Sequence, residues 1–261
     1  MNNKNLLLII VLITLLNFVK SSDLSYKKVH LVDSIELANG NTNYFFRGNQ
    51  PTQTLSNGTK IFPYDELVEF LRNSSLSEFG VKLPEQFYII DIKLISGPLP
   101  SELPDLELEQ NFFAANPTLG ESRTNQTWGD IIDPQLVPQD KLEEYASTIS
   151  SWSADKLPQR MRDYHNILLT ERELPTVLYV HCECGCDRTG EVMASYVMKF
   201  KGWDLPKALE WDFAIAGRDI NFSNRWSAQW YCLYLNYVEN YKLDCNQPTP
   251  PPKSLISINN Y

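Results

Sequence analysis

Apolar and polar positions along this chain follow two different periods. Residues 87–95 (FYIIDIKLI) and 176–180 (TVLYV) are short runs rich in β-branched and aromatic residues, which is typical of buried strands. Shorter extended runs lie at 28–32 and 44–46, among turns rich in Asn and Gly. The pattern therefore predicts at least two buried strands and a strand-rich amino-terminal part.

Elsewhere the apolar residues recur with the period of a helix, and these segments alternate with the strands. Such alternation favours an α/β fold: a single domain with a central, mostly parallel sheet flanked by helices. Three prolines within residues 97–104 predict a loop, and residues 105–135 are polar and predict a long irregular connection. The predicted helices cover residues 64–71, 139–149, 158–170, 191–200, 204–211 and 225–241.

The first 22 residues have the layout of a secretory signal peptide. Lys4 precedes a mostly apolar run at 6–19, and small residues follow at Ser21 and Ser22. An uncleaved anchor is the alternative, but a run of about 14 residues is shorter than the roughly 20 that span a bilayer. We expect cleavage near Ser22, so that the mature chain is secreted or endolysosomal and has no transmembrane segment.

This leaves a domain at 23–245 and a Pro-rich tail at 246–261 that we expect to be disordered. In a secreted chain, Asn-x-Ser/Thr triplets become plausible glycosylation sites. The four triplets begin at Asn57, Asn73, Asn125 and Asn221. Asn57 precedes Gly58, which predicts a turn there.

The composition of the chain limits the classes of partner that it can bind. A hydrophobic content of 43% excludes a mostly disordered chain of 261 residues. A formal net charge of −9 argues against nucleic acid and anionic membrane surfaces, where Lys and Arg must replace counterions. The sequence does not determine the oligomeric state.

The most informative stretch is 180–190 (VHCECGCDRTG), between a predicted strand and a predicted helix. A loop at the carboxyl end of a parallel strand can turn its amides inward, and the start of the next helix adds positive partial charge. This is a site for an anion. Cys182 would be stabilised there as a thiolate nucleophile, and Arg188 would grip two oxygens of a phosphate.

The other residues of this stretch fit the same chemistry. Thr189 can donate its hydroxyl to the sulfur and ease its departure, and His181 would orient the loop by hydrogen bonds to backbone carbonyls. Gly185 and Gly190 allow tight backbone conformations. The predicted phosphate-binding residues are Glu183, Cys184, Gly185, Cys186, Asp187 and Arg188.

Residues 181–190 resemble the HCxxGxxR(S/T)G signature of the cysteine-based protein tyrosine and dual-specificity phosphatase superfamily. Residues 46–51 (FRGNQP) and 191–208 resemble segments of its atypical, lipid-phosphatase-like branch, whereas residues 97–150 resemble nothing that we can place. The resemblance implies hydrolysis of phosphate monoesters, on phosphoprotein or phospholipid, through a thiophosphate intermediate. It implies no metal and no organic cofactor.

This superfamily also uses an aspartic general acid, which the resemblance places upstream of the cysteine. Asp155 lies 27 residues before Cys182 and is our first candidate, with an ordinary helix cap as the alternative role. Asp130 and Asp133 are the reserve candidates. Asp187, directly before the arginine, resembles a position that serves as acid or shapes the loop in lipid-directed relatives.

Five cysteines in an oxidising compartment suggest two disulfides and one free thiol. We expect Cys184 and Cys186 to bridge to Cys232 and Cys245, in either pairing, with Cys182 free. The alternative is that Cys182 pairs with a neighbour and the enzyme is held oxidised.

Two rival interpretations remain. Alternate cysteines suit zinc poorly, and an arginine in the loop opposes a cation, so a metal clamp is disfavoured. A secreted phospho-ligand-binding pseudophosphatase would keep the anion site without turnover, but a pure binder has no need of Cys182.

Glu183 and Asp187 make the loop acidic, which favours substrates with a single phosphate.

Overall fold

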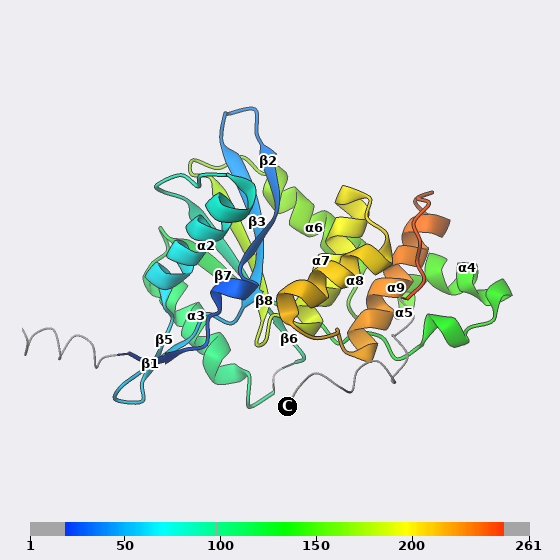
Figure 1. Cartoon of the computed structure of the whole chain (residues 1–261), viewed down its shortest axis with the longest axis horizontal. Coiled ribbons are helices and arrows are strands. Elements are labelled where there is room, and N and C mark those ends of the chain that lie inside the picture. Colours follow the sequence, from blue (N-terminus) through cyan, green and yellow to red (C-terminus); the bar gives the residue numbers. More distant parts are fainter. Residues whose placement is uncertain (1–18, 98, 248–261) are drawn as a thin grey trace, which may run out of the picture.

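A five-stranded sheet forms the centre of the computed structural model, which describes residues 19–97 and 99–247. The strand order is β2-β3-β8-β6-β7; β2 is antiparallel to β3, and the other neighbours are parallel. Figure 1 shows helices on both sides of this sheet. The expected α/β fold with a mostly parallel sheet is therefore confirmed. The strands are β2 (His30–Glu36), β3 (Thr42–Asn49), β6 (Tyr88–Ile95), β7 (Gly120–Gln126) and β8 (Thr176–Cys182).

Alternate side chains of the central strands enter two separate cores. Phe45 on β3 packs in the core under helices α6 to α9, whereas its neighbours Tyr44 and Phe46 pack in the core under α2 and α3. The period of two in a strand explains this division. The helices of the first face are α6 (Leu157–Leu169), α7 (Asp187–Lys201), α8 (Leu205–Ala216) and α9 (Phe222–Tyr237), and those of the second are α2 (Tyr64–Phe79) and α3 (Leu103–Ala115).

Smaller elements complete the chain. Two helices, α4 (Gln139–Ser147) and α5 (Ile149–Trp152), pack beside α9 around Trp230. A second sheet has the order β1-β4-β5. Its strands are β1 (Val19–Ser22), β4 (Gln53–Leu55) and β5 (Lys60–Ile61), and the short 3-10 turns are η1 (Tyr26–Lys28) and η2 (Pro134–Leu136).

Strand β8 is buried along its whole length, between β3 and β6. The prediction of a strand at 176–180 is confirmed, and the strand continues through His181 to Cys182. The carboxyl end of the central strand therefore delivers the cysteine directly into the loop before α7.

The prediction for residues 97–135 was wrong in two places, where the structure has α3 and β7. Helix α3 begins with Pro104 in its first turn and Asp105 near its positive end, both of which favour a helix start. Strand β7 (GESRTNQ) has no apolar alternation because it is an edge strand, held by its backbone pairing with β6.

The predicted signal peptide lies outside the described residues, except that residues 19–22 form β1. Of the predicted tail, only residues 246 and 247 are described. Among the described parts of the chain, no helix is both long and apolar enough to span a membrane.

One buried side chain ties the sheet to α6. Asn43 is 0% exposed, and its amide donates to the carbonyls of Leu168 and Thr170, at 2.9 and 3.0 Å. Its Oδ1 accepts from the amide of Thr176, at 2.7 Å, where β8 begins. We expect Asn43→Ala to lower the free energy of unfolding by about 3 kcal/mol, because buried polar groups lose their partners.

The measurement is chemical denaturation of both proteins. Asn111→Ala is the matched control, because Asn111 is exposed on α3, and it should change stability by less than about 0.5 kcal/mol. Equal effects of the two substitutions would show that Asn43 has no special role.

Candidate active site

The loop between β8 and α7 holds the thiol. Cys182 is a free cysteine, 2% exposed, and is paired in the parallel register with Asn49 of β3. The loop ends at the amino terminus of α7, a helix of 15 residues. Because a helix start carries partial positive charge, a thiolate or a bound anion is stabilised at this position.

Gly185 lets the loop lie against β3. Its φ is +69°, and a Cβ at this position would come within 2.6 Å of the Gly48 carbonyl oxygen. Gly190 is needed for a different reason. A Cβ there would come within 2.7 Å of Ile220 and 2.8 Å of the Asp212 carboxylate, so the glycine permits the close approach of α7 to its neighbours.

Arg188 is positioned from a part of the chain where the sequence predicted no role. Its Nη1 donates to the carbonyl of Leu94, at 2.8 Å, and to the Glu102 carboxylate, at 2.5 Å. Within the described residues these are the acceptors of this guanidinium, so Nε and Nη2 have no hydrogen-bond partner there. Glu102 also accepts from the amide of Ser96, which fixes the carboxylate.

Arg47 of β3 contacts the loop between β8 and α7 from the interior of the protein. It is 0% exposed, its Nη1 pairs with the Asp212 carboxylate of α8 at 2.6 Å, and its Nη2 donates to the Gly185 carbonyl at 2.8 Å. The sequence resemblance included residues 46–51 but gave Arg47 no role. Its contacts show that it fixes the conformation of Gly185.

His181 does not orient the loop through backbone carbonyls, as the sequence had predicted. Its Nε2 lies 3.0 Å from Asp91 and 3.6 Å from Glu109, and all three side chains are buried. Burial alone would lower the pKa of His181, but the carboxylates of Glu109 and Asp91 overcome it and raise the pKa to about 9. The histidine is therefore a cation beneath the loop.

Asp91, Glu109 and His181 are also close enough together to hold a metal ion. Lys93 decides against this role, because its ammonium lies 2.7 Å from Glu109 and 2.7 Å from the Gln50 amide oxygen. Burial raises the pKa of Asp91 against the opposing charge of His181. The contacts of the cluster are accounted for by the pairing of Lys93 and His181 with the two buried carboxyl groups.

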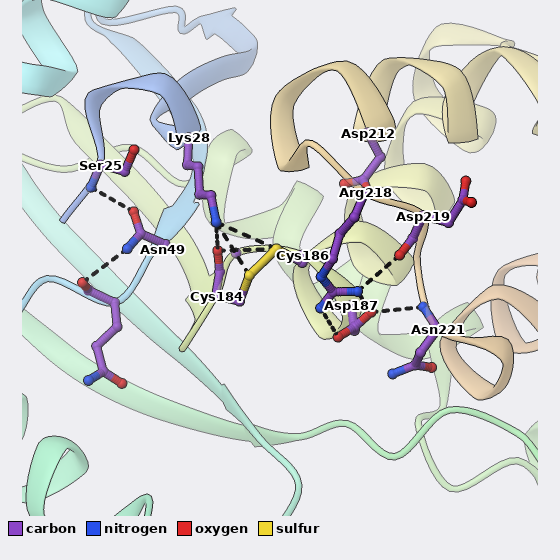
Figure 2. The surroundings of a disulfide bond; sticks show 12 residues. Ser25, Lys28, Asn49, Cys184, Cys186, Asp187, Asp212, Arg218, Asp219 and Asn221 are labelled. Carbon is purple, nitrogen blue, oxygen red and sulfur yellow. Dashed lines mark hydrogen bonds and ion pairs between the residues drawn. A yellow bond between two sulfur atoms is a disulfide. The ribbon is translucent and has the colours of Figure 1, made fainter. Parts of the chain in front are cut away.

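Lys28 and Arg218 reach the loop from opposite sides, as Figure 2 shows. The Lys28 ammonium donates to the Cys184 carbonyl, at 2.7 Å. Burial lowers the pKa of Lys28, the charge of Cys182 raises it, and Arg218 and Arg47 lower it further. Hydrogen bonding to Asp187 and, after it, the charges of Asp187 and Cys182 raise the pKa of Arg218, so Lys28 and Arg218 both lie within electrostatic reach of Cys182. Lys28 lies 154 positions before that cysteine, so no motif could reveal it.

Asp187 is paired with Arg218. The two carboxylate oxygens accept from Nη1 at 2.8 Å and Nη2 at 2.5 Å, and the amide of Asn221 adds a third bond. Burial would raise the pKa of Asp187, but these hydrogen bonds lower it. Asp187 therefore stays ionised and braces the loop, which does not favour the alternative that it is the acid.

The two disulfides are Cys184–Cys186 and Cys232–Cys245. The pairing expected from the sequence, between the loop and the last helix, was wrong, although the four cysteines and the free Cys182 were identified correctly. The reason is local: Cys184 and Cys186 lie with their Cα atoms 5.2 Å apart around Gly185. The carboxyl-terminal pair joins α9 to the segment that follows it.

Asp155 is 0% exposed and anchors the segment that follows β7. Its Oδ1 accepts from the amide of Trp128 at 2.8 Å, and its Oδ2 from that of Gly129 at 2.6 Å. Both oxygens of the side chain are therefore engaged with backbone amides. That Asp155 is the general acid stays a prediction, one that this placement does not favour.

Asp130 lies on the same segment, next to the residues that Asp155 holds. It is 5% exposed, and Ser153 Oγ is 3.4 Å from its Oδ2. Burial and the charge of Asp155 raise the pKa of Asp130 to about 6. The other reserve candidate, Asp133, accepts from the amide of Gln135 and caps η2.

The remaining predicted residues are placed as follows. Thr189 is 0% exposed, and its hydroxyl has no hydrogen-bond partner within residues 19–97 and 99–247. Glu183 is exposed on the loop. Of the predicted glycosylation sites, Asn57 is exposed in a turn and Asn73 on α2, Asn125 is half-buried on β7, and Asn221 caps α9.

No family model and no curated protein matches this chain. Solved structures do, among them Tk-PTP in the active form (13% identity, TM-score 0.34, covering 79% of this chain and 96% of the other). A single-substitution variant of human DUSP28 matches at 13% identity and a TM-score of 0.31, covering 74% and 91% of the two chains. The Siw14 catalytic core matches at 12% identity and a TM-score of 0.30, covering 83% and 95%.

These three proteins are cysteine-based protein tyrosine or dual-specificity phosphatases, the superfamily that residues 181–190 resemble. Likeness at these TM-scores carries no argument about what the present chain does. The functional argument rests on the residues around Cys182.

The contacts of Arg47 generate a test of how the loop is held. Arg47→Met leaves the buried Asp212 carboxylate unpaired, and we expect a loss of about 3–5 kcal/mol in unfolding free energy. The double variant Arg47→Met/Asp212→Leu removes both charges and should recover most of that loss. Both variants lack the bond to the Gly185 carbonyl, so both should bind inorganic phosphate more weakly than the wild type.

Chemical denaturation and calorimetric titration with phosphate measure the two effects separately. A double variant that binds phosphate as tightly as the wild type would show that Arg47 contributes to stability alone.

Proposed function

We propose that this protein is a secreted, cysteine-dependent phosphatase that hydrolyses phosphate monoesters. The observation that carries the proposal is the placement of a free thiol, Cys182, at the carboxyl end of the central strand, at the start of a loop that ends at the amino terminus of α7. Arg188, in the first turn of that helix, is held by Glu102, and two of its nitrogens have no hydrogen-bond partner within the described residues. A nucleophile and an anion site are thus combined in one loop.

In the first step the Cys182 thiolate attacks phosphorus and the ester oxygen leaves, which gives a cysteinyl phosphate. Arg188 and the loop amides hold the non-bridging oxygens as charge moves between them. In the second step water attacks phosphorus, the S–P bond breaks, and inorganic phosphate and the thiolate are released. Thr189, one residue further on α7, would assist the departing sulfur, although its hydroxyl forms no hydrogen bond to Cys182 in this structure.

Asp130 is the residue we assign to proton transfer. It must protonate the leaving oxygen and then take a proton from water, which needs a carboxyl group that is neutral at the start. Its raised pKa of about 6 supplies this form at mildly acidic pH. Asp155 acts as a positioning residue, since it holds the amides of Trp128 and Gly129.

Phosphoprotein and phospholipid monoesters are the substrates we propose. The acidic residues Glu183 and Asp187 disfavour a substrate with several phosphates less than the sequence indicated, because Arg218 pairs with Asp187 and the Lys28 ammonium contacts the same loop.

Secretion remains part of the proposal, supported by the predicted signal peptide and by the two disulfides, which persist in oxidising compartments.

A second candidate is a phospho-ligand-binding module without turnover. The burial of Cys182, 2% exposed, favours it, because a nucleophile must reach phosphorus. The presence of a free thiol rather than a disulfide at this position favours the enzyme.

The first test is Cys182→Ser. A serine hydroxyl is a far weaker nucleophile here, so release of phosphate from an aryl phosphate should fall by at least about 1,000-fold, while phosphate still binds. Arg188→Ala is the comparison and should lose both turnover and phosphate binding. Turnover near the wild-type rate in Cys182→Ser would contradict the mechanism. A wild-type protein that binds phosphate and never releases it from an ester would establish the second candidate.

The second test separates the two aspartates. Asp130→Asn should slow hydrolysis of an alkyl phosphate by about 100-fold or more, and that of an activated aryl phosphate far less, because only the poor leaving group needs a proton. In the wild type, kcat/KM for the alkyl ester should fall as pH rises through about 6, since Asp130 then ionises.

Asp155→Asn is the matched variant. As a positioning residue, it should slow both esters alike. Because the charge of Asp155 helps to raise the pKa of Asp130, the fall of kcat/KM should also move to lower pH in this variant. If Asp155→Asn instead shows the leaving-group dependence and Asp130→Asn does not, the acid is Asp155.

A further inference from the structure

The two disulfides of this chain have very different surroundings. Cys232 and Cys245 are 0% and 8% exposed, packed where α9 meets the segment that follows it. In the other pair, Cys184 is partly exposed and Cys186 is 1% exposed. Cys184 is therefore the more exposed cysteine of the loop disulfide.

A cation lies against the loop disulfide. The Lys28 ammonium is 3.3 Å from Cys184 Sγ and 3.6 Å from Cys186 Sγ. Within the described residues Lys28 forms no ion pair with a carboxylate, so its charge is not cancelled by a direct partner. Figure 2 shows the ammonium facing the two sulfurs.

The buried sulfur is also placed to accept negative charge. Cys186 is the N-cap residue of α7, whose 15 residues begin at Asp187. The partial positive charge of the helix start and the ammonium of Lys28 both favour a thiolate on Cys186. Disulfide exchange is faster when the leaving sulfur is a better thiolate, and here the sulfur of the more exposed cysteine and the good leaving group are the two ends of one bond.

We propose that Cys184–Cys186 is a thiol-exchange site that accepts small thiols such as glutathione. A thiolate from solution attacks Cys184 Sγ and forms a new S–S bond to it. The Cys184–Cys186 bond breaks, and its electron pair leaves on Cys186 as a thiolate. One disulfide bond is lost and one is formed, so the step needs no further oxidant or reductant, and a second thiolate attacking the mixed disulfide would leave both cysteines reduced.

The site is separate from the proposed hydrolysis, because exchange needs neither Cys182 nor bound phosphate. It lies in the same loop, however, and Gly185, whose carbonyl is held by Arg47, is the residue between the two sulfurs. Opening the disulfide therefore alters the covalent restraint on the loop while the contacts of Arg47 remain.

The experiment follows each disulfide in the folded mature protein. Oxidised protein is incubated with increasing glutathione, quenched with acid, alkylated, and mapped by mass spectrometry. We expect glutathione on Cys184 and a newly alkylated Cys186, with Cys232–Cys245 intact at a concentration at least about ten times higher. Glutathione on Cys186 rather than Cys184, or opening of Cys232–Cys245 at the same or a lower concentration, would overturn the proposal.

Lysine variants test the role of charge. Lys28→Met should slow exchange at Cys184 by about three- to tenfold, because the leaving thiolate loses the ammonium that lies 3.6 Å from Cys186 Sγ, and Lys28→Arg should restore most of the rate. Lys27→Met is the matched control. Lys27 is exposed on the same turn, whereas the lysine that contacts the two sulfurs is Lys28. Its rate should stay within about twofold of the wild type. Equal rates for Lys28→Met and Lys27→Met would show that Lys28 does not activate the bond.

Discussion

The loop between β8 and α7 depends on the contacts of the buried Arg47 guanidinium. Arg47 is 0% exposed, so its charge must be met inside the protein, by the Asp212 carboxylate and the Gly185 carbonyl. A buried charge that loses a partner destabilises a protein by several kcal/mol. The loop conformation is therefore coupled to the packing of β3 against α8, and the position of Cys182 is set by the core of the molecule rather than by the loop alone.

Several cations lie near the loop between β8 and α7, although the chain as a whole has a formal net charge of −9. Three arginines near the loop each have a carboxylate partner, which orients them and reduces their long-range field. Lys28 has no such ion pair within the described residues, so its ammonium and the start of α7 remain as the unbalanced positive charge beside the sulfurs. The arginine pairs are Arg47–Asp212, Arg188–Glu102 and Arg218–Asp187.

Parts of this arrangement could be predicted from the sequence and parts could not, for physical reasons. Strands β6 and β8 were predicted because full burial demands apolar residues at nearly every position. Strand β7 was not, because an edge strand is held by backbone bonds that any side chain allows.

The motif identified Cys182 and Arg188, which are close in sequence. The side chains that support the motif come from distant segments, and only the fold brings them to it. Glu102 lies on the stretch that was expected to be a loop, and Lys28 lies in a 3-10 turn near the amino terminus. The cysteine pairing failed for a related reason. With Gly185 between them, the Cα atoms of Cys184 and Cys186 lie 5.2 Å apart. These two cysteines therefore pair with each other and form no long link to the last helix.

Two sulfur chemistries follow from one electrostatic environment. The start of α7 and the nearby cations favour a thiolate on Cys182, which is what nucleophilic attack on phosphorus needs. The start of α7 and the Lys28 ammonium also act on Cys186, because Cys186 lies in the same loop as Cys182. The disulfide in this loop therefore lies in the same electrostatic environment as Cys182, and the proposed hydrolysis and the proposed thiol exchange depend on the same charged groups.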